Sequence, residues 1–221
     1  MKRIQAQQIA KQYGKGDTAV TALKGISFTI DAGEFVAVMG ESGSGKSTLL
    51  SIVGTLNSPT SGRLTVDDID VYALGKDKRA DFRRKSIGFV FQNFNLLPYL
   101  TLAENVMLPL ATVREKRAKK RSMALAALAR VGLAEKAERL PSQVSGGEQE
   151  RVAIARAIVG RPPIILADEP TGNLDSKTGK DIMGIINGLN SEGMTIIMVT
   201  HNPDYAAYAH RLLRVADGVL E

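Results

Sequence analysis

The sequence contains no cysteine and no tryptophan, and aromatic residues make up only 5% of its 221 residues. Without cysteine there can be no disulfide and no thiolate metal site, which fits a cytosolic protein. Long apolar runs are also missing, since stretches such as Ile164–Ala167 are far shorter than the roughly 20 residues that span a bilayer. No secretory signal is predicted, because Lys2 and Arg3 lead into glutamine-rich sequence. With 44% hydrophobic and 24% charged residues, the chain is expected to be soluble and globular, and its length fits one domain, with room for a subdomain and a large core.

The formal net charge is +6, and much of it lies in two clusters, Lys76–Lys85 and Arg114–Arg121. Three interpretations remain open. The favoured one is a solvated helix face, and the second is a surface that docks near anionic lipid headgroups. A nucleic-acid surface is the least favoured, because aromatic residues scarcely interleave with these charges. No nucleic-acid partner is therefore expected.

Hydrophobic periodicity predicts strands that alternate with helices. The apolar run Phe35–Met39 suits a buried strand, and a helical pattern follows from Lys46 to about Val53. Residues 102–160 are helical in pattern and rich in alanine and charged residues. Further strands are predicted at Ile26–Ile30, Ile87–Phe91, Ile164–Ala167, Thr195–Thr200 and Leu212–Ala216, the last of them final in the chain, and a further helix at Lys177–Leu189. This order predicts an α/β fold with a parallel sheet and an inserted helical lobe.

A glycine-rich loop lies between the predicted strand Phe35–Met39 and the helix that begins at Lys46. It matches the phosphate-binding pattern G-x-x-x-x-G-K-[ST] in the strand–loop–helix context that this pattern requires, so a chance glycine-rich turn is disfavoured. Backbone N–H groups and the helix N-terminus would face the phosphates. Lys46 can reach the β- and γ-phosphates and Ser47 can bind Mg²⁺, while the Glu41 side chain should point away. The candidate nucleotide-binding residues of this loop are Gly40, Glu41, Ser42, Gly43, Ser44, Gly45, Lys46, Ser47 and Thr48.

Two acids, Asp168 and Glu169, follow the predicted strand Ile164–Ala167. The ends of parallel strands are where α/β sheets place ligand-binding groups. Because successive strand residues point in opposite directions, the two carboxylates are not expected to share one task. We expect Asp168 to hold Mg²⁺, and Glu169 to orient or deprotonate the water that attacks the γ-phosphate. The alternative is a pair of surface acids at a strand–turn junction.

The segment Val144–Arg151 precedes a predicted helix at Val152–Val159 and places Ser-Gly-Gly at the N-terminus of that helix, which is a second potential anion site. It resembles the signature motif of the ATP-binding-cassette (ABC) ATPases, usually Leu-Ser-Gly-Gly-Gln, and it lies 168 − 145 = 23 residues before Asp168, the spacing of that family. Val144 and Glu148 depart from the usual motif. Glu148 can accept a hydrogen bond from a ribose, but it brings negative charge near the nucleotide. The candidate nucleotide-binding residues of this motif are Ser145, Gly146, Gly147 and Glu148.

The resemblance to ABC ATPases runs from about Tyr13 to Gly218 and implies roles for further residues. Tyr13 is similar to the aromatic residue that stacks on adenine, Gln92 to the glutamine that reaches Mg²⁺, and Asp175 to the acid of the loop that crosses between partners. His201 resembles the histidine that contacts the γ-phosphate. Without the resemblance, Tyr13 and His201 would each be taken for structural residues. The implied catalytic residues are Glu169, His201 and Lys46, and the implied metal ligands are Ser47, Gln92 and Asp168.

The same resemblance implies a P-loop NTPase with a RecA-like core, an antiparallel β subdomain and an inserted α-helical lobe. The core lobe is expected at about residues 1–91 and 161–221, and the helical lobe at about 92–160. ABC cassettes act as head-to-tail dimers, so an ATP-dependent homodimer is implied. In it, Ser145–Gly147 of one copy would close over ATP and Mg²⁺ held by Gly40–Thr48 of the other. His210 receives no role.

The wording of the motifs, including Leu166–Asp175, is most similar to the MacB and LolD type of ABC ATPase. This type pairs with FtsX-like permeases in export, lipoprotein release or mechanotransmission, which implies a cytoplasmic subunit held peripherally on the inner face of the cell membrane. The alternatives are an FtsE-like cell-division ATPase and a soluble ABC protein that acts on nucleic acid. A non-catalytic regulatory subunit is disfavoured because the catalytic residues are present.

The segment Gly88–Val106 is unusually apolar for a junction between lobes. Its large side chains either form an exposed patch that receives a helix of the membrane partner, or pack the core of their own lobe. The residues concerned are Phe94, Leu96, Leu97, Tyr99 and Leu100.

Overall fold

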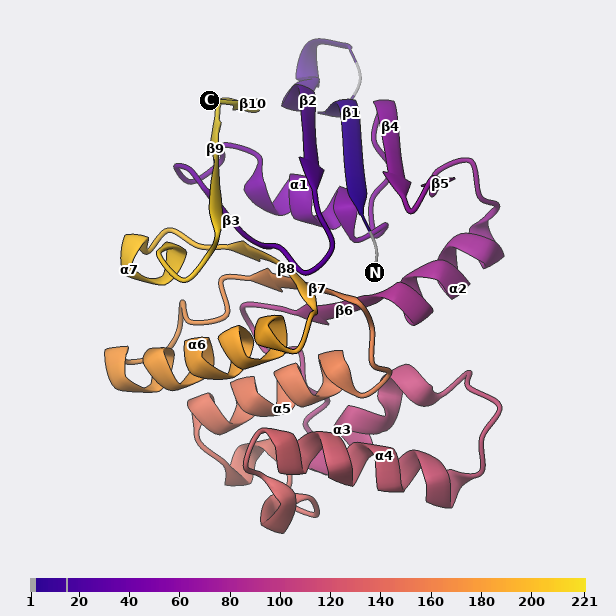
Figure 1. Cartoon of the computed structure of the whole chain (residues 1–221), viewed down its shortest axis with the longest axis vertical. Helices are drawn as coiled ribbons and strands as arrows, with labels where there is room; N and C mark the ends of the chain where they lie inside the picture. Colours follow the sequence, from indigo (N-terminus) through magenta and orange to yellow (C-terminus); the bar gives the residue numbers. More distant parts are fainter. Residues whose placement is uncertain (1–2, 15) are drawn as a thin grey trace.

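The centre of the molecule is a six-stranded sheet (Figure 1). The computed structural model describes residues 3–14 and 16–221, so Lys2 lies outside the described residues. From one edge to the other, the strands are β10 (Val219–Leu220), β9 (Arg211–Ala216), β3 (Phe35–Met39), β8 (Thr195–Val199), β7 (Ile164–Asp168) and β6 (Ile87–Val90). Neighbouring strands are parallel except β9 and β10. Helices cover both faces of the parallel part, which explains why β3, β7 and β8 are continuous apolar runs.

A second, four-stranded sheet is antiparallel and stands at the top of Figure 1. Its strands, in order, are β2 (Val20–Ile30), β1 (Ile4–Tyr13), β4 (Ser61–Val66) and β5 (Ile69–Asp70). The helix α1 (Lys46–Val53) lies between this sheet and the central one. The two sheets are also joined at their edges, where the Lys24 backbone N–H donates to the Gly218 carbonyl over 2.8 Å.

Four helices lie on the other face of the central sheet (Figure 1). They are α3 (Leu102–Met107), α4 (Arg117–Arg130), α5 (Gly146–Ile158) and α6 (Ser176–Ser191). The helix α2 (Lys76–Ser86) leads directly into β6, and the short α7 (Pro203–Ala206) follows β8. Short 3₁₀ turns occupy Gly16–Thr18, Leu108–Leu110, Ala134–Lys136 and Pro141–Gln143.

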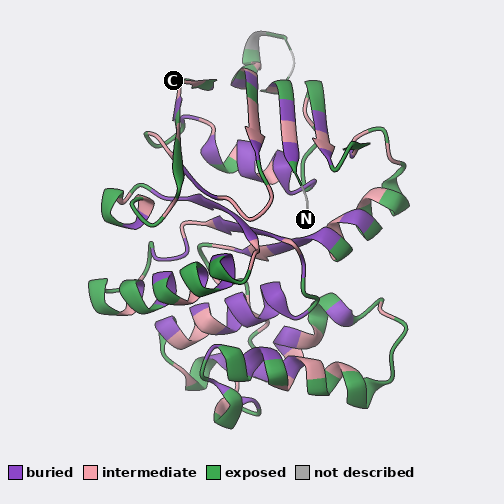
Figure 2. Ribbon diagram, viewed as in Figure 1, coloured by how far each residue is buried: buried purple, intermediate pink, exposed green. Residues whose placement is uncertain are grey.

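The central sheet separates two hydrophobic cores. Along β8, Ile196 and Met198 belong to the core shared with α3 to α6, whereas Ile197 and Val199 belong to the core shared with α1 and the antiparallel sheet. This alternation follows from the two-residue period of a strand. Figure 2 shows the result as continuous burial along the central strands, with exposed residues on the outer sides of the helices.

The predicted α/β class is confirmed, and β3 and α1 have the predicted bounds. Several predicted bounds need correction. The strand predicted at Ile26–Ile30 begins at Val20, the strand predicted at Thr195–Thr200 ends at Val199, and the helix predicted at Lys177–Leu189 spans Ser176–Ser191. The strand predicted at Ile87–Phe91 ends at Val90, and the strand predicted as the final one is followed by β10, which the Asp217-Gly218 turn folds back onto it. The helix predicted at Val152–Val159 begins earlier, at Gly146, because the Ser145 side chain caps it.

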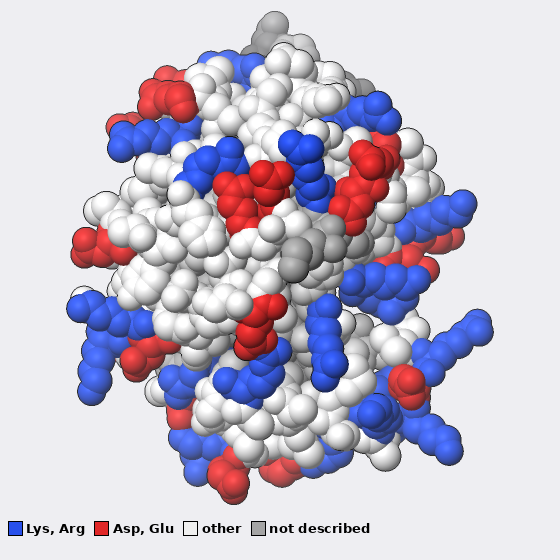
Figure 3. Space-filling model, in the orientation of Figure 1, with Lys and Arg blue, Asp and Glu red and all other residues white. Residues whose placement is uncertain are grey.

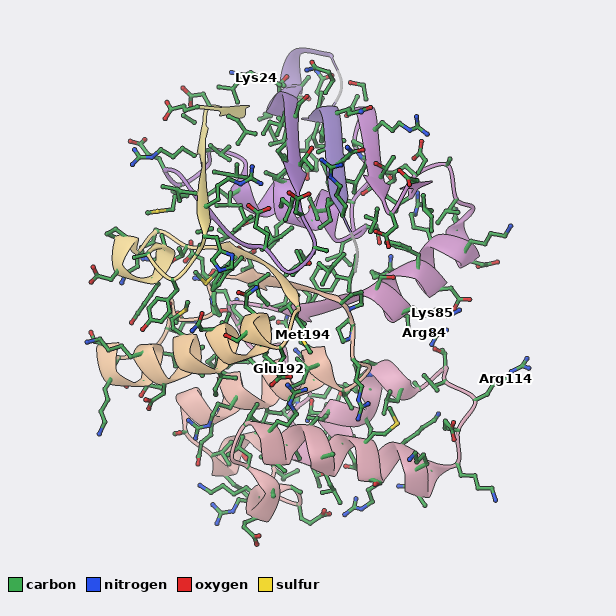
Figure 4. The ribbon with its side chains drawn as sticks, viewed as in Figure 1. Lys24, Arg84, Lys85, Arg114, Glu192 and Met194 are labelled. Atoms are coloured by element: carbon green, nitrogen blue, oxygen red, sulfur yellow. The ribbon has the colours of Figure 1, made fainter. Side chains whose placement is uncertain are left out.

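The first basic cluster forms α2, which buries Phe82 and exposes most of its charges, as expected of a solvated helix face. The second cluster enters a helix only at Arg117. In Figure 4, Arg84 and Lys85 lie at the end of α2, and Arg114 projects from the loop before α4. Basic side chains alternate with acidic ones on the face drawn in Figure 3. Within the described ranges, no helix combines the length and apolarity that a membrane span requires.

Candidate active site

The phosphate loop connects β3 to α1, and its glycines are required by close packing. A Cβ atom on Gly40 would lie 2.0 Å from the Val215 carbonyl oxygen, and one on Gly45 would lie 2.5 Å from the Ala22 carbonyl oxygen. Gly45 has a left-handed backbone, with φ of 105°, and is the N-cap of α1. The loop is therefore held between β9 and β2. Sequence patterning offered no sign of these contacts, because it does not give the order of strands.

The polar atoms of the loop converge at the N-terminus of α1. The buried Lys46 ammonium donates to the carbonyls of Gly40, over 2.8 Å, and Glu41, over 2.6 Å. The Ser44 hydroxyl oxygen is buried and has no hydrogen-bond partner among the described residues. Ser42 and Gly43 are exposed, and so is Glu41, which meets Lys46 through its main chain. A buried ammonium and an unpartnered hydroxyl at a helix N-terminus fit phosphate oxygens.

Two oxygen ligands suitable for Mg²⁺ come together at the end of β7. The Ser47 hydroxyl donates to Asp168 Oδ1 over 3.3 Å. Burial raises the pKa of Asp168, and the nearby Glu169 adds to this, while the Ser47 hydrogen bond and Lys46 oppose it. Among residues 3–14 and 16–221 no group of three or more His, Cys, Asp or Glu side chains is placed to hold a metal ion. A hydroxyl beside a carboxylate fits Mg²⁺, which takes one or two protein ligands and completes its shell with water and phosphate oxygens.

The ends of β6, β7 and β8 bring Gln92 and His201 next to the carboxylate of Glu169. Glu169 Oε2 lies 3.1 Å from His201 Nδ1 and 3.4 Å from Gln92 Nε2. Glu169 has a left-handed backbone, with φ of 49°, and its N–H donates to the Val199 carbonyl over 3.0 Å. The Asn173 side chain in turn donates to the Gln92 carbonyl over 3.0 Å. A carboxylate held between an imidazole and an amide is suited to orienting a water molecule or accepting its proton.

The signature motif forms the first turn of α5. Ser145 is the N-cap, and its hydroxyl accepts from the Glu148 N–H while Glu148 Oε2 accepts from the Ser145 N–H, forming a capping box. The surroundings of Gly146 are open, since a Cβ atom there would approach nothing closer than 3.8 Å. At Gly147 it would lie 2.3 Å from Thr178. The first glycine is therefore free for a ligand, and the second is packed within the chain.

Two further candidates have partners within their own chain. Asp175 is the N-cap of α6, and its carboxylate accepts from the N–H groups of Lys177 and Thr178 and from the Thr178 hydroxyl, which lower its pKa. Tyr13 ends β1 with 41% of its surface exposed, and the Lys11 ammonium lies 5.0 Å from its ring centre. One face of that ring is thus shared with a cation.

Sequence patterning missed Arg156 and gave His210 no role. Arg156, on α5, donates 2.5 Å hydrogen bonds to the carbonyls of Phe94 and Asn95, whose backbones are both left-handed. A single charge inside the apolar run Val152–Ile158 was the available signal. The Phe35 N–H donates to His210 Nδ1 over 3.1 Å, so this histidine fixes the start of β3.

A protein-family model described as ABC transporter matches residues 23–172. The macrolide export ATP-binding/permease protein MacB of Syntrophobacter fumaroxidans is 50% identical over 226 residues, covering 100% of this chain and 31% of that protein. The ABC transporter ATP-binding protein YvrO of Bacillus subtilis is 50% identical over 213 residues, covering 96% of this chain and 93% of that protein. The chain thus spans about a third of the length of the MacB relatives and nearly all of YvrO.

Among solved structures, the dimeric ATP-binding cassette MJ0796 in a post-hydrolysis state, bound to ADP and phosphate, superimposes with a TM-score of 0.91. It is 44% identical, and the match covers 99% of this chain and 96% of that one. Sequence, fold and the arrangement of the strand ends agree, and the chain therefore belongs to the ABC transporter family as an ATP-hydrolysing cassette.

Proposed function

We propose that this chain is the ATPase subunit of an ABC transporter and hydrolyses ATP at composite sites between two copies. The observation that carries the proposal is the contact of Glu169 with both Gln92 and His201, at the same end of β7 as the Ser47–Asp168 pair. In this proposal Glu169 orients or deprotonates the attacking water, and His201 holds the Glu169 carboxylate in position. Lys46 and the backbone of Gly40–Thr48 bind the phosphates.

Ser47, Asp168 and Gln92 would hold Mg²⁺, which supplies neutralising charge to the phosphate oxygens when bound. Tyr13 would stack on adenine through its exposed ring surface. The base would either displace the Lys11 ammonium from the ring face that it covers or stack on the opposite face. Asp175 would act through the start of α6, which it caps, rather than as a direct ligand.

Two copies are required because the signature motif has an open glycine at a helix N-terminus and a separate location from the phosphate loop. The proposal is supported by the dimeric arrangement named for the MJ0796 cassette. Head-to-tail pairing would bring Ser145–Gly147 of one copy over ATP bound to the other. The expected division into a core lobe of about residues 1–91 and 161–221 and a helical lobe of about 92–160 suits such closure.

A membrane permease of the FtsX-like type is the proposed partner, in line with the permease named in the MacB relatives. A hollow of about 330 Å³ lies where α2, β6 and the end of α5 meet, and it is lined by apolar residues and by Arg83, Arg84 and Arg156. In the apolar segment before α3, Tyr99 is 74% exposed, whereas Leu96 packs against the helical core. In this proposal the exposed Tyr99 is available to a helix of the permease, and Leu96 serves the core of its own lobe. The chain would lie peripherally on the inner face of the membrane.

The test is Glu169→Gln, which keeps the shape of the side chain. We expect this variant to bind ATP, to form a stable dimer in size-exclusion chromatography, and to lose about 10²–10⁴-fold in phosphate release. Wild-type phosphate release would contradict the catalytic role of Glu169. Co-purification with an FtsX-like protein would support the partner, whereas tight, salt-sensitive binding to nucleic acid would favour the alternative of a non-transport ABC protein.

A further inference from the structure

The last residue of the signature motif carries a negative charge at the place where a triphosphate would be met. Glu148 stands where ABC ATPases usually have an uncharged glutamine, and its side chain is only 15% exposed. A carboxylate that faced the partner's ATP without compensation would oppose the binding of a polyanion. The chain therefore needs a reason to tolerate this acid.

The contacts of Glu148 supply that reason. Its Oε2 atom accepts from the Ser145 N–H over 2.9 Å, and its Oε1 atom forms an ion pair with the Lys136 ammonium. Arg151, one turn along α5, places a guanidinium nitrogen 3.9 Å from the same Oε1 atom. The hydrogen bonds from Lys136 and Ser145 hold the pKa of Glu148 at about 2, so the carboxylate is ionised and fully engaged.

Lys136 comes from outside every motif. It lies in the 3₁₀ turn Ala134–Lys136, 12 residues before Glu148, and the turn is fixed by backbone hydrogen bonds from Lys136 N–H to the Leu133 carbonyl and from Arg139 N–H to the Lys136 carbonyl. The lysine is therefore delivered to the first turn of α5 by a rigid segment. One acid and two basic residues give this cluster a net charge of +1.

We propose that Lys136 is a positioning residue of the composite ATP site. It holds the Glu148 carboxylate in the capping box of α5 and cancels its charge, so that the helix N-terminus stays attractive to the γ-phosphate of ATP on a second copy. This inference rests on the proposed function, because it needs the signature motif to act on the partner's nucleotide. Its ligand is a nucleoside triphosphate bound to another chain, not one bound to its own phosphate loop.

The experiment is a double-mutant cycle in the Glu169→Gln background, measured as the ATP concentration at which half of the protein is dimeric. Lys136→Met is expected to raise that concentration about tenfold or more, because Glu148 becomes an uncompensated acid at the interface. In a Glu148→Gln background the same substitution should change it less than about twofold, because the charge that Lys136 neutralises is gone. Lys136→Arg keeps the positive charge, so it should dimerise at about the same ATP concentration as the parent.

Controls separate this inference from simpler effects. Lys119→Met removes the same charge from α4 and should leave dimerisation unchanged. Binding of a fluorescent ATP analogue to the monomer should be equal in all variants, because Lys136 is not part of the phosphate loop. An equal effect of Lys136→Met in both backgrounds would show a general charge effect and overturn the positioning role.

Failure of the two proposals can be told apart. If the Glu169→Gln parent does not dimerise with ATP, the composite site itself is refuted. If it dimerises and Lys136→Met dimerises at the same ATP concentration, only the role of Lys136 is refuted. If circular dichroism shows that Lys136→Met does not fold, the Glu148→Gln variant decides. It is expected to dimerise at an ATP concentration no higher than that of the parent, and a higher ATP concentration would refute the inference.

Discussion

A methyl group on Gly147 would lie 2.3 Å from the Cγ2 atom of Thr178. The first turn of α5, which carries the signature motif, therefore rests directly on the first turn of α6, which Asp175 caps. The second signature glycine is required by its own chain, independently of any nucleotide. The first, Gly146, has no such neighbour.

Gly147→Ala is expected to lower the free energy of unfolding by about 1–3 kcal/mol, because α5 and α6 must move apart. Gly146→Ala is the matched control and should be neutral or slightly stabilising, since alanine is the better helix former. Thr178→Ser removes the clashing methyl group and keeps the hydroxyl that donates to Asp175 over 2.6 Å. It should restore the stability of Gly147→Ala in urea unfolding. A loss of stability that Thr178→Ser does not reverse would contradict this contact.

His201→Ala is expected to lower kcat about 10²-fold while the affinity for ATP changes little. The imidazole lies 3.1 Å from Glu169 Oε2, so its removal frees the proposed catalytic carboxylate to adopt other orientations. Steady-state kinetics and equilibrium ATP binding separate the two effects. His210→Ala removes the other histidine and should reduce thermal stability without changing kcat, because His210 bonds the start of β3. A normal kcat for His201→Ala would contradict the proposal that His201 positions Glu169.

Glu150→Gln is expected to remove part of the pH dependence of stability. Both carboxylate oxygens of Glu150 are buried without a hydrogen-bond partner among the described residues, and burial raises its pKa from 4.5 to about 8 despite the nearby Arg156. Below about pH 4.5 both the folded and the unfolded chain hold the proton. Between 4.5 and about 8 only the folded chain holds it, so the free energy of unfolding falls as the pH rises, and the loss is complete above about 8.

The stability advantage of Glu150→Gln over the wild type should therefore grow between pH 4.5 and about 8 and then level off. Urea unfolding at a series of pH values measures this difference, in which the other titrating groups cancel. The exposed Glu135→Gln serves as the control and should follow the wild-type curve. A constant difference across the range would mean that Glu150 has an ordinary pKa.

Sequence patterning predicted the elements that are buried on both faces, because a continuous apolar run such as Phe35–Met39 is typical of a strand covered by helices on both sides. It was weaker where charge hides the pattern or where elements are short. The final strand β10 has only two residues and is held by pairing to β9, a tertiary contact. The bounds of α5 were misjudged because glycine is a poor helix former, and the Ser145 cap compensates for it.

The candidate site could be predicted where a motif fixes the local geometry, as at Gly40–Ser47. Gln92, Glu169 and His201 lie together because β6, β7 and β8 are adjacent parallel strands. The spacing of these residues in the sequence does not reveal that strand order. The partners of Glu148 and Phe94 could not be predicted from the sequence. Lys136 and Arg156 arrive from other segments, and only the packed structure brings them there.

In the proposed site, the two hydrogen bonds that Lys46 donates to the carbonyls of Gly40 and Glu41 would affect how nucleotide binds. An ammonium that already faces oxygen atoms of its own loop has lost most of its hydration shell during folding. Arrival of a phosphate then exchanges one set of acceptors for another, and little water has to be removed at that moment. The discrimination between a triphosphate and a shorter nucleotide would thus depend on how far Lys46 must turn from these carbonyls, a property of the loop backbone and not of the lysine alone.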